Sequence, residues 1–189
     1  MIATVILVLQ RENRRYSFDF DKLQAILIDG DIICRRGSGF LSDLIADIST
    51  EDKRFSHVGI VRIVDGFITV IHAEGSFNFK DCIVKEESLA DFLRTARSVG
   101  IYRVIDFEGH LISSKVIEYL DKPFDWGFDI FNDENVYCTE LVFIILKRLN
   151  SMIQPQKVFV NQIGRYVIPL ESISNSRYFS EIWFYEQNK

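Results

Sequence analysis

Cysteines are scarce in this sequence, and their scarcity excludes two classes of protein. The chain of 189 residues has only Cys34, Cys82 and Cys138, with neither a CxxC motif nor a His-x-His pair. An odd, sparse set of cysteines is not a disulfide framework, and the spacing is not that of a structural zinc site. We therefore expect reduced thiols, a cytoplasmic location, and no metal or organic cofactor.

Long apolar stretches are lacking as well. The apolar stretch Ile2–Leu9 is too short to span a bilayer, and neither a basic segment nor a small-residue cleavage site frames it. It predicts an edge strand, since β-branched residues favour strands. The alternative is the remnant of a leader or anchor, which would make the protein exported or membrane-anchored.

Basic runs are missing too, and the net charge is −5. We therefore do not expect nucleic acid as a partner. Apolar residues make up 48% and charged residues 26% of the chain, which is typical of one globular domain over residues 1–189. Phenylalanine is frequent, with 16 residues. That indicates either a large aromatic core or an apolar pocket.

A β-hairpin is the clearest local signal in what is present. The segments 56–64 and 67–74 are rich in β-branched residues, and Asp65-Gly66 separates them. Asp-Gly is a strong signal for a two-residue hairpin turn. We expect two antiparallel strands joined at this turn.

The register of this hairpin brings polar side chains together. A two-residue turn places Gly59 opposite His72 and His57 opposite Glu74. Since side chains alternate between faces, His57, His72 and Glu74 share one face, and Gly59 leaves space beside them. The hairpin therefore supplies a histidine with two candidate polar neighbours.

A second signal is the segment that begins at Cys138 and ends at Lys147-Arg148. Acidic residues precede it and basic residues close it, which suits a helix dipole. Unpaired backbone N–H groups at the helix start would favour a thiolate at Cys138. The alternative is that Cys138 is a small buried apolar residue.

The remaining pattern mixes helices and strands without regular βαβ alternation, which predicts an α+β fold. Expected strands are 31–35, 99–105, 158–160 and 182–185; expected helices are 40–48, 88–97 and 111–120, with a loop over 122–134.

A thiol hydrolase needs a thiolate, a histidine that exchanges protons with it, and a third group that orients the histidine. Cys138 and His57 are the candidates for the first two roles, and His72 or Glu74 for the third. A metal site made of Cys138, His57 and His72 is a weaker alternative, because the spacing is not paired. Cys34 and Cys82 are interpreted as structural.

Five short motifs occur in a telling order: Gly30-Asp31-Ile32-Ile33, Ser56-His57-Val58-Gly59-Ile60, Val70-Ile71-His72-Ala73, Lys122-Pro123-Phe124-Asp125 and Tyr137-Cys138-Thr139-Glu140-Leu141. The set resembles the YiiX/YebB-like hydrolases, a circularly permuted, papain-like branch of the NlpC-type cysteine peptidase superfamily. The resemblance covers residues 30–142, and residues 1–20 lie outside it.

The resemblance implies an antiparallel sheet packed on the helix that carries the cysteine. It makes Cys138 the nucleophile and His57 the base. His72 takes the third position, where the family often has Glu, and Glu74 remains the alternative.

For the neighbours of the nucleophile, the resemblance implies that Tyr137 and Thr139 line the pocket or help to form an oxyanion site. Thr139 stands where Ser is usual. Asp31 is expected to be structural, holding the start of its strand.

The expected activity is hydrolysis of an amide, peptide or ester bond through a thioester, on a small peptide, amide or lipid-like substrate. Two alternatives stay open: a lipid-directed acyltransferase or thioesterase activity on the same residues, and a non-catalytic module that binds peptide or lipid. In such a module, side chains such as Trp126 or Phe128 would fill the cleft. The sequence does not indicate an oligomeric state.

Overall fold

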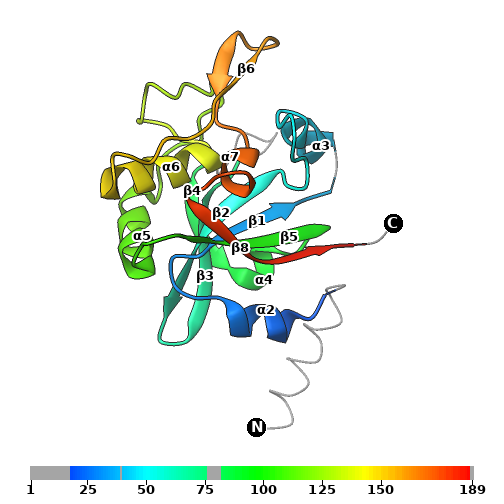
Figure 1. Ribbon diagram of the computed structural model, residues 1–189, viewed down its shortest axis with the longest axis vertical. Helices are drawn as coiled ribbons and strands as arrows, with labels where there is room; N and C mark the ends of the chain where they lie inside the picture. Colours follow the sequence, from blue (N-terminus) through cyan, green and yellow to red (C-terminus); the bar gives the residue numbers. More distant parts are fainter. Residues whose placement is uncertain (1–17, 39, 76–81, 188–189) are drawn as a thin grey trace, which may run out of the picture.

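The computed structural model describes residues 18–38, 40–75 and 82–187, and a six-stranded sheet is its centre (Figure 1). The strand order is β4-β3-β2-β1-β5-β8, and each neighbouring pair is antiparallel. The strands are β1 (Ile32–Arg36), β2 (His57–Val64), β3 (Phe67–Ala73), β4 (Val84–Ser88), β5 (Ser98–Val104) and β8 (Phe179–Glu186).

Helices cover both faces of this sheet (Figure 1). They are α2 (Phe20–Ile26), α3 (Phe40–Ala46), α4 (Leu89–Phe92), α5 (Gly109–Val116), α6 (Cys138–Leu149) and α7 (Glu171–Ser174), and a 3₁₀ turn (Ile117–Tyr119) follows α5. A small hairpin of β6 (Val158–Val160) and β7 (Arg165–Val167) projects from the body beside the start of α6. This arrangement confirms the α+β prediction.

The two faces bury separate apolar cores, because side chains alternate along each strand. On one face, Ile32 and Cys34 of β1 pack with α5 and α6. On the other, Ile33 packs with α2 and α4. The helix that begins at Cys138 thus lies on the sheet that carries His57.

The predicted hairpin register is confirmed. Val64 pairs with Phe67 and Ile60 with Ile71, so the next pair in the same register is Gly59 and His72. A Cβ atom at Gly59 would lie 2.4 Å from Val70 Cγ1 and 3.1 Å from His72 Cβ. A residue without a side chain at position 59 therefore avoids a steric clash with Val70 and leaves space for the side chain of His72.

The predicted helix over 88–97 is wrong in length. Only α4 is helical, and β5 already begins at Ser98. Arg97 donates its backbone N–H to Arg36 of β1, which draws this segment into the sheet. Tertiary pairing overrides the local helical pattern here.

The N-terminal prediction, a strand or leader at Ile2–Leu9, lies outside the described residues. Within the residues that are described, no helix is both long enough and apolar enough to cross a membrane.

Asp31 precedes β1 and is 1% exposed. Its carboxylate accepts from Arg103 Nε at 2.8 Å and Nη2 at 2.9 Å, and from the backbone N–H of Ile28 at 2.9 Å. These bonds join the start of β1 to β5 and to the end of α2, as expected of a structural residue.

Candidate active site

Cys138 is the first residue of α6, and its thiol lies at the helix start. Backbone N–H groups of Val58, Thr139 and Cys138 itself face the sulfur. The burial of the sulfur outweighs them and raises the pKa of the Cys138 thiol from 9.0 to about 11. The N–H groups at the helix start thus lower the pKa of the thiol, as predicted, but burial raises it by more.

His57 is the first residue of β2, and it contacts the histidine of the facing strand. His57 Nε2 and His72 Nδ1 are 2.8 Å apart, and the two rings are nearly perpendicular, at 86°. The ring of Phe92 packs against both, with centroids 5.7 Å from His57 and 5.1 Å from His72. Both imidazoles are thus held in one orientation by a hydrogen bond and a shared aromatic contact.

Both histidines are neutral at physiological pH. Burial is the largest cause, and it lowers the pKa of His57 well below its usual 6.5, with Arg35 adding to the effect. Burial also lowers the pKa of His72, although the carboxylate of Glu87 opposes this. A neutral imidazole has a lone pair, so either ring can accept a proton.

Of the two candidates for the third position, His72 contacts His57, whereas Glu74 contacts Lys85. Glu74, the alternative, has its carboxylate 2.5 Å from Lys85 Nζ. His72 Nε2 is 3.0 Å from Glu87 Oε1, and Lys85 is also 3.0 Å from the Glu87 carboxylate. The chain of contacts therefore runs from His57 through His72 to Glu87.

Glu87 is a site residue that the sequence reasoning missed. It lies on β4, whose register places Lys85 opposite His72 and Glu87 opposite Val70. Burial alone would raise the pKa of the Glu87 carboxyl, but hydrogen bonds from His72 and Lys85 lower it to about 2. Lys85, Glu86 and Glu87 are all charged, so the sequence has no apolar alternation here that would indicate a strand or its pairing with β3.

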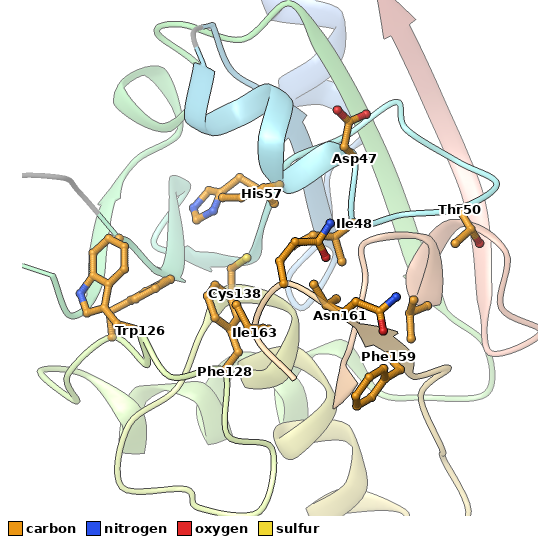
Figure 2. A pocket seen from close by; sticks show the side chains of 16 residues that line it. Asp47, Ile48, Thr50, His57, Trp126, Phe128, Cys138, Phe159, Asn161 and Ile163 are labelled. Atoms are coloured by element: carbon orange, nitrogen blue, oxygen red, sulfur yellow. The ribbon is translucent and has the colours of Figure 1, made fainter. Parts of the chain in front are cut away.

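Cys138 and His57 line one cavity of about 560 Å³ (Figure 2). The helix α3, the aromatic segment before α6, and the β6–β7 hairpin form its walls. Its lining is mostly apolar and consists of Ile45, Asp47, Ile48, Thr50, His57, Gly75, Phe124, Trp126, Phe128, Cys138, Val158, Phe159, Val160, Asn161, Gln162 and Ile163.

A turn after Phe124 shapes the aromatic wall of this cavity. Buried Asp125 accepts the backbone N–H of Gly127 at 2.8 Å and of Asp129 at 2.5 Å. Between these two, Phe128 adopts a left-handed backbone with φ of 51°, which is costly for a bulky residue. The Asp125 carboxylate thus holds a strained phenylalanine against the cavity, and Trp126 and Phe128 line the cleft without filling it.

Tyr137 and Thr139 do not take the positions expected of them. The Tyr137 hydroxyl accepts the backbone N–H of Ile168 at 2.8 Å, and the Thr139 hydroxyl donates to the Ile168 carbonyl at 2.6 Å. Both side chains are almost fully buried, and neither is among the residues found to line the cavity. They tie the start of α6 to the segment after β7, so these two side chains serve to position the helix that carries Cys138.

Cys34 and Cys82 are buried, form no disulfide, and are not among the residues found to line the cavity. Burial raises the pKa of the Cys34 thiol well above its usual value. His110 is exposed at the start of α5, and its Nδ1 lies 3.9 Å from Glu108. Of the three cysteines and three histidines in the chain, the cavity brings together Cys138 and His57, with His72 behind His57.

An antiparallel sheet that carries a histidine, packed on a helix that begins with a cysteine, defines the papain-like class of fold, here with the histidine earlier in the chain. The chain belongs to the family described as permuted papain-like amidase enzymes, YaeF/YiiX, C92, whose family model matches residues 27–167. It is therefore a cysteine hydrolase in the general sense that this family defines.

A solved structure has the same fold. YiiX from Escherichia coli O157:H7, described as a metalloprotein, superposes with a TM-score of 0.66 at 18% sequence identity. The match covers 85% of this chain and 98% of that chain. No curated protein matches the sequence.

Proposed function

We propose that the protein is a thiol amidase in which Cys138 is the nucleophile, His57 the base, and His72 the residue that orients His57. The hydrogen bond between His57 Nε2 and His72 Nδ1, 2.8 Å long, carries this proposal. It leaves Nδ1 of His57 for the thiol, at the cavity that Cys138 and His57 both line. Nucleophile, base and orienting group are the three parts that such catalysis needs.

The reaction starts from a neutral pair, because burial keeps both the thiol and the imidazole uncharged. As Sγ of Cys138 attacks the substrate carbonyl carbon, its proton passes to Nδ1 of His57. The oxyanion is stabilised by the backbone N–H of Cys138 at the start of α6. His57 then donates the proton to the departing amine, and an acyl thioester on Cys138 remains.

Water completes the cycle. His57, neutral again, takes a proton from the water as its oxygen attacks the thioester carbonyl. The C–S bond breaks, the carboxylic acid leaves, and the proton returns to the sulfur.

The lining of the cavity favours an apolar acyl group as the part of the substrate that is bound. Phe124, Trp126, Phe128 and Ile163 contribute apolar side chains, and among the described residues of the lining Asp47 is the one with an acidic side chain. Neither Lys nor Arg is among the described residues of the lining, so those residues do not offer a cation in direct contact with a substrate carboxylate or phosphate. We therefore place the neutral acyl side of the scissile bond in this cavity.

A metal ion has no part in the proposal, although the E. coli YiiX is described as a metalloprotein. Both ring nitrogens of His72 are in hydrogen bonds, and Lys85 lies between the carboxylates of Glu74 and Glu87. Across residues 18–38, 40–75 and 82–187, no three His, Cys, Asp or Glu side chains are placed to hold an ion. The donor set does not fit a metal.

Transfer of the acyl group to an amine or alcohol instead of water would use the same thioester. The apolar cavity suits the acyl donor of such a reaction equally well. Adding a primary amine to the assay separates the two activities, because a transferase forms the new amide in preference to the free acid.

The experiment is a hydrolysis assay on N-acyl amides of increasing acyl length, with wild type, Cys138→Ala and His57→Ala. We expect turnover to rise with acyl length and to fall by a factor on the order of 10³ or more in both variants. Cys34→Ala, at a buried cysteine outside the cavity lining, is the matched control and should retain activity. Full activity in Cys138→Ala would refute the proposal.

A further inference from the structure

His72 is bonded through both ring nitrogens, and its second partner is a carboxylate on another strand. His72 Nε2 is 3.0 Å from Oε1 of Glu87, while His72 Nδ1 is 2.8 Å from His57 Nε2. His72 is 0% exposed, so solvent does not compete for either bond. The positions of the hydrogens on both rings then follow from the chemistry of the groups at each end.

The carboxylate of Glu87 determines which ring nitrogen of His72 carries a hydrogen. Glu87 is ionised at neutral pH, because hydrogen bonds from His72 and Lys85 outweigh burial and lower its pKa to about 2. An ionised carboxylate can only accept, so His72 carries its hydrogen on Nε2. His72 is neutral, and its Nδ1 therefore has a lone pair.

The position of the hydrogen on His57 follows from the position of the hydrogen on His72. Because His72 Nδ1 can only accept, His57 Nε2 must donate in the bond between them. His57 is itself neutral, so its remaining nitrogen, Nδ1, has a lone pair. A base for the Cys138 thiol needs that lone pair.

We propose that Glu87 is a positioning residue, which acts through His72 to set the tautomer of His57 that leaves Nδ1 free to accept the proton of Cys138. This inference rests on the proposed function, and it adds to it a residue that touches neither the thiol nor the cavity. Without an obligatory acceptor at position 87, the His57–His72 bond could run in either direction. In the reversed direction His57 carries its hydrogen on Nδ1 and cannot accept another.

Charged groups surround the His57–His72 pair, and they favour an ionised Glu87 that accepts from His72. Arg35 and Lys85 are the cations that act on His57, while Glu74 and Glu87 are the anions that act on His72. Lys85 contacts both carboxylates, at 2.5 Å to Glu74 and 3.0 Å to Glu87. Oε1 of Glu87 accepts from His72 while Oε2 accepts from Lys85, so both of its oxygens have a donor.

The test is the tautomer of each histidine, measured by ¹⁵N NMR on histidine-labelled protein at neutral pH. The chain has only three histidines, and exposed His110 is an internal reference. In wild type we expect His57 and His72 both to be neutral with the hydrogen on Nε2. In Glu87→Gln the amide can donate as well as accept, so the ¹⁵N shifts of both rings should move towards a mixture of tautomers.

Glu86→Gln is the matched control. Glu86 is the preceding residue of β4, and its carboxylate accepts from Arg62 and Thr69 instead. Its substitution should leave the histidine shifts unchanged. The activity of Glu87→Gln should fall about tenfold or more, with kcat reduced more than KM is raised, as when an outer hydrogen-bond partner of an active-site imidazole is lost.

Hydrogen on Nδ1 of His57 in wild type, or an unchanged ¹⁵N pattern in Glu87→Gln, would overturn the inference. The NMR readout does not depend on catalysis. If Cys138→Ala retained full activity while the tautomers were as expected, the proposed function would fail and the role of Glu87 in setting the tautomer would stand.

Discussion

The Cys138 thiol of the ligand-free protein should react slowly with iodoacetamide at neutral pH and faster throughout the alkaline range. Burial raises its pKa from 9.0 to about 11. These two units correspond to about 2.7 kcal/mol against ionisation. At pH 7, about one thiol in ten thousand is then ionised, and the fraction rises about tenfold per pH unit.

Site-resolved mass spectrometry measures this directly, because the labelling of Cys34, Cys82 and Cys138 is read separately. The rate at Cys138 should still be climbing at about pH 10. His57→Gln is the control. Since burial is the main cause of the raised thiol pKa, the pH at which the labelling rate of Cys138 increases should stay within about one pH unit of the wild-type value. A labelling rate that is constant from about pH 5 upward would refute the reasoning, because it would mean a preformed thiolate–imidazolium pair.

Three further predictions concern stability. The pKa values of His57 and His72 are lowered in the folded protein, so the unfolded chain binds protons first as the pH falls below about 6.5. The free energy of unfolding should therefore fall by up to about 1.4 kcal/mol per pH unit for each imidazole. Urea unfolding at about pH 7 and about pH 5 tests this, and an unfolding midpoint that does not change with pH would contradict it. Asp31→Ala removes the acceptor of two guanidinium bonds and should cost about 3 kcal/mol in the same assay; a loss below about 1 kcal/mol would show that these bonds matter little. Gly59→Ala places a methyl group 2.4 Å from Val70 Cγ1, so it should cost about 1–3 kcal/mol and reduce activity through displacement of His72; wild-type stability and turnover would exclude that crowding.

Sequence reasoning succeeded where local chemistry determines geometry. Asp65-Gly66 sets a two-residue turn, and the turn alone gives the register that places His72 opposite Gly59. The helix that begins at Cys138 and ends near Lys147-Arg148 was predicted from its charge pattern, and the structure has it from Cys138 to Leu149.

It failed where the outcome depends on distant parts of the chain. Glu87 contacts His72 because β4 pairs with β3, and the polar segment Val84–Ser88 gives no local signal for that partner. The pKa of Cys138 has a similar explanation: the helix pattern reveals the N–H groups that lower it, but not the burial that outweighs them. Tyr137 and Thr139 were misplaced because Ile168, their common partner, lies about thirty residues further along the chain.

The most direct test of Cys138 as the nucleophile and His57 as its base is to trap the acyl-enzyme. An activated apolar acyl ester is mixed with wild-type protein, the reaction is quenched with acid, and intact mass and peptide mapping locate the adduct. We expect one acyl group, on Cys138, that is absent in Cys138→Ala and forms far more slowly in His57→Ala. An adduct on Cys34 or Cys82, or hydrolysis at the wild-type rate by Cys138→Ala, would contradict the assignment of Cys138 as the nucleophile.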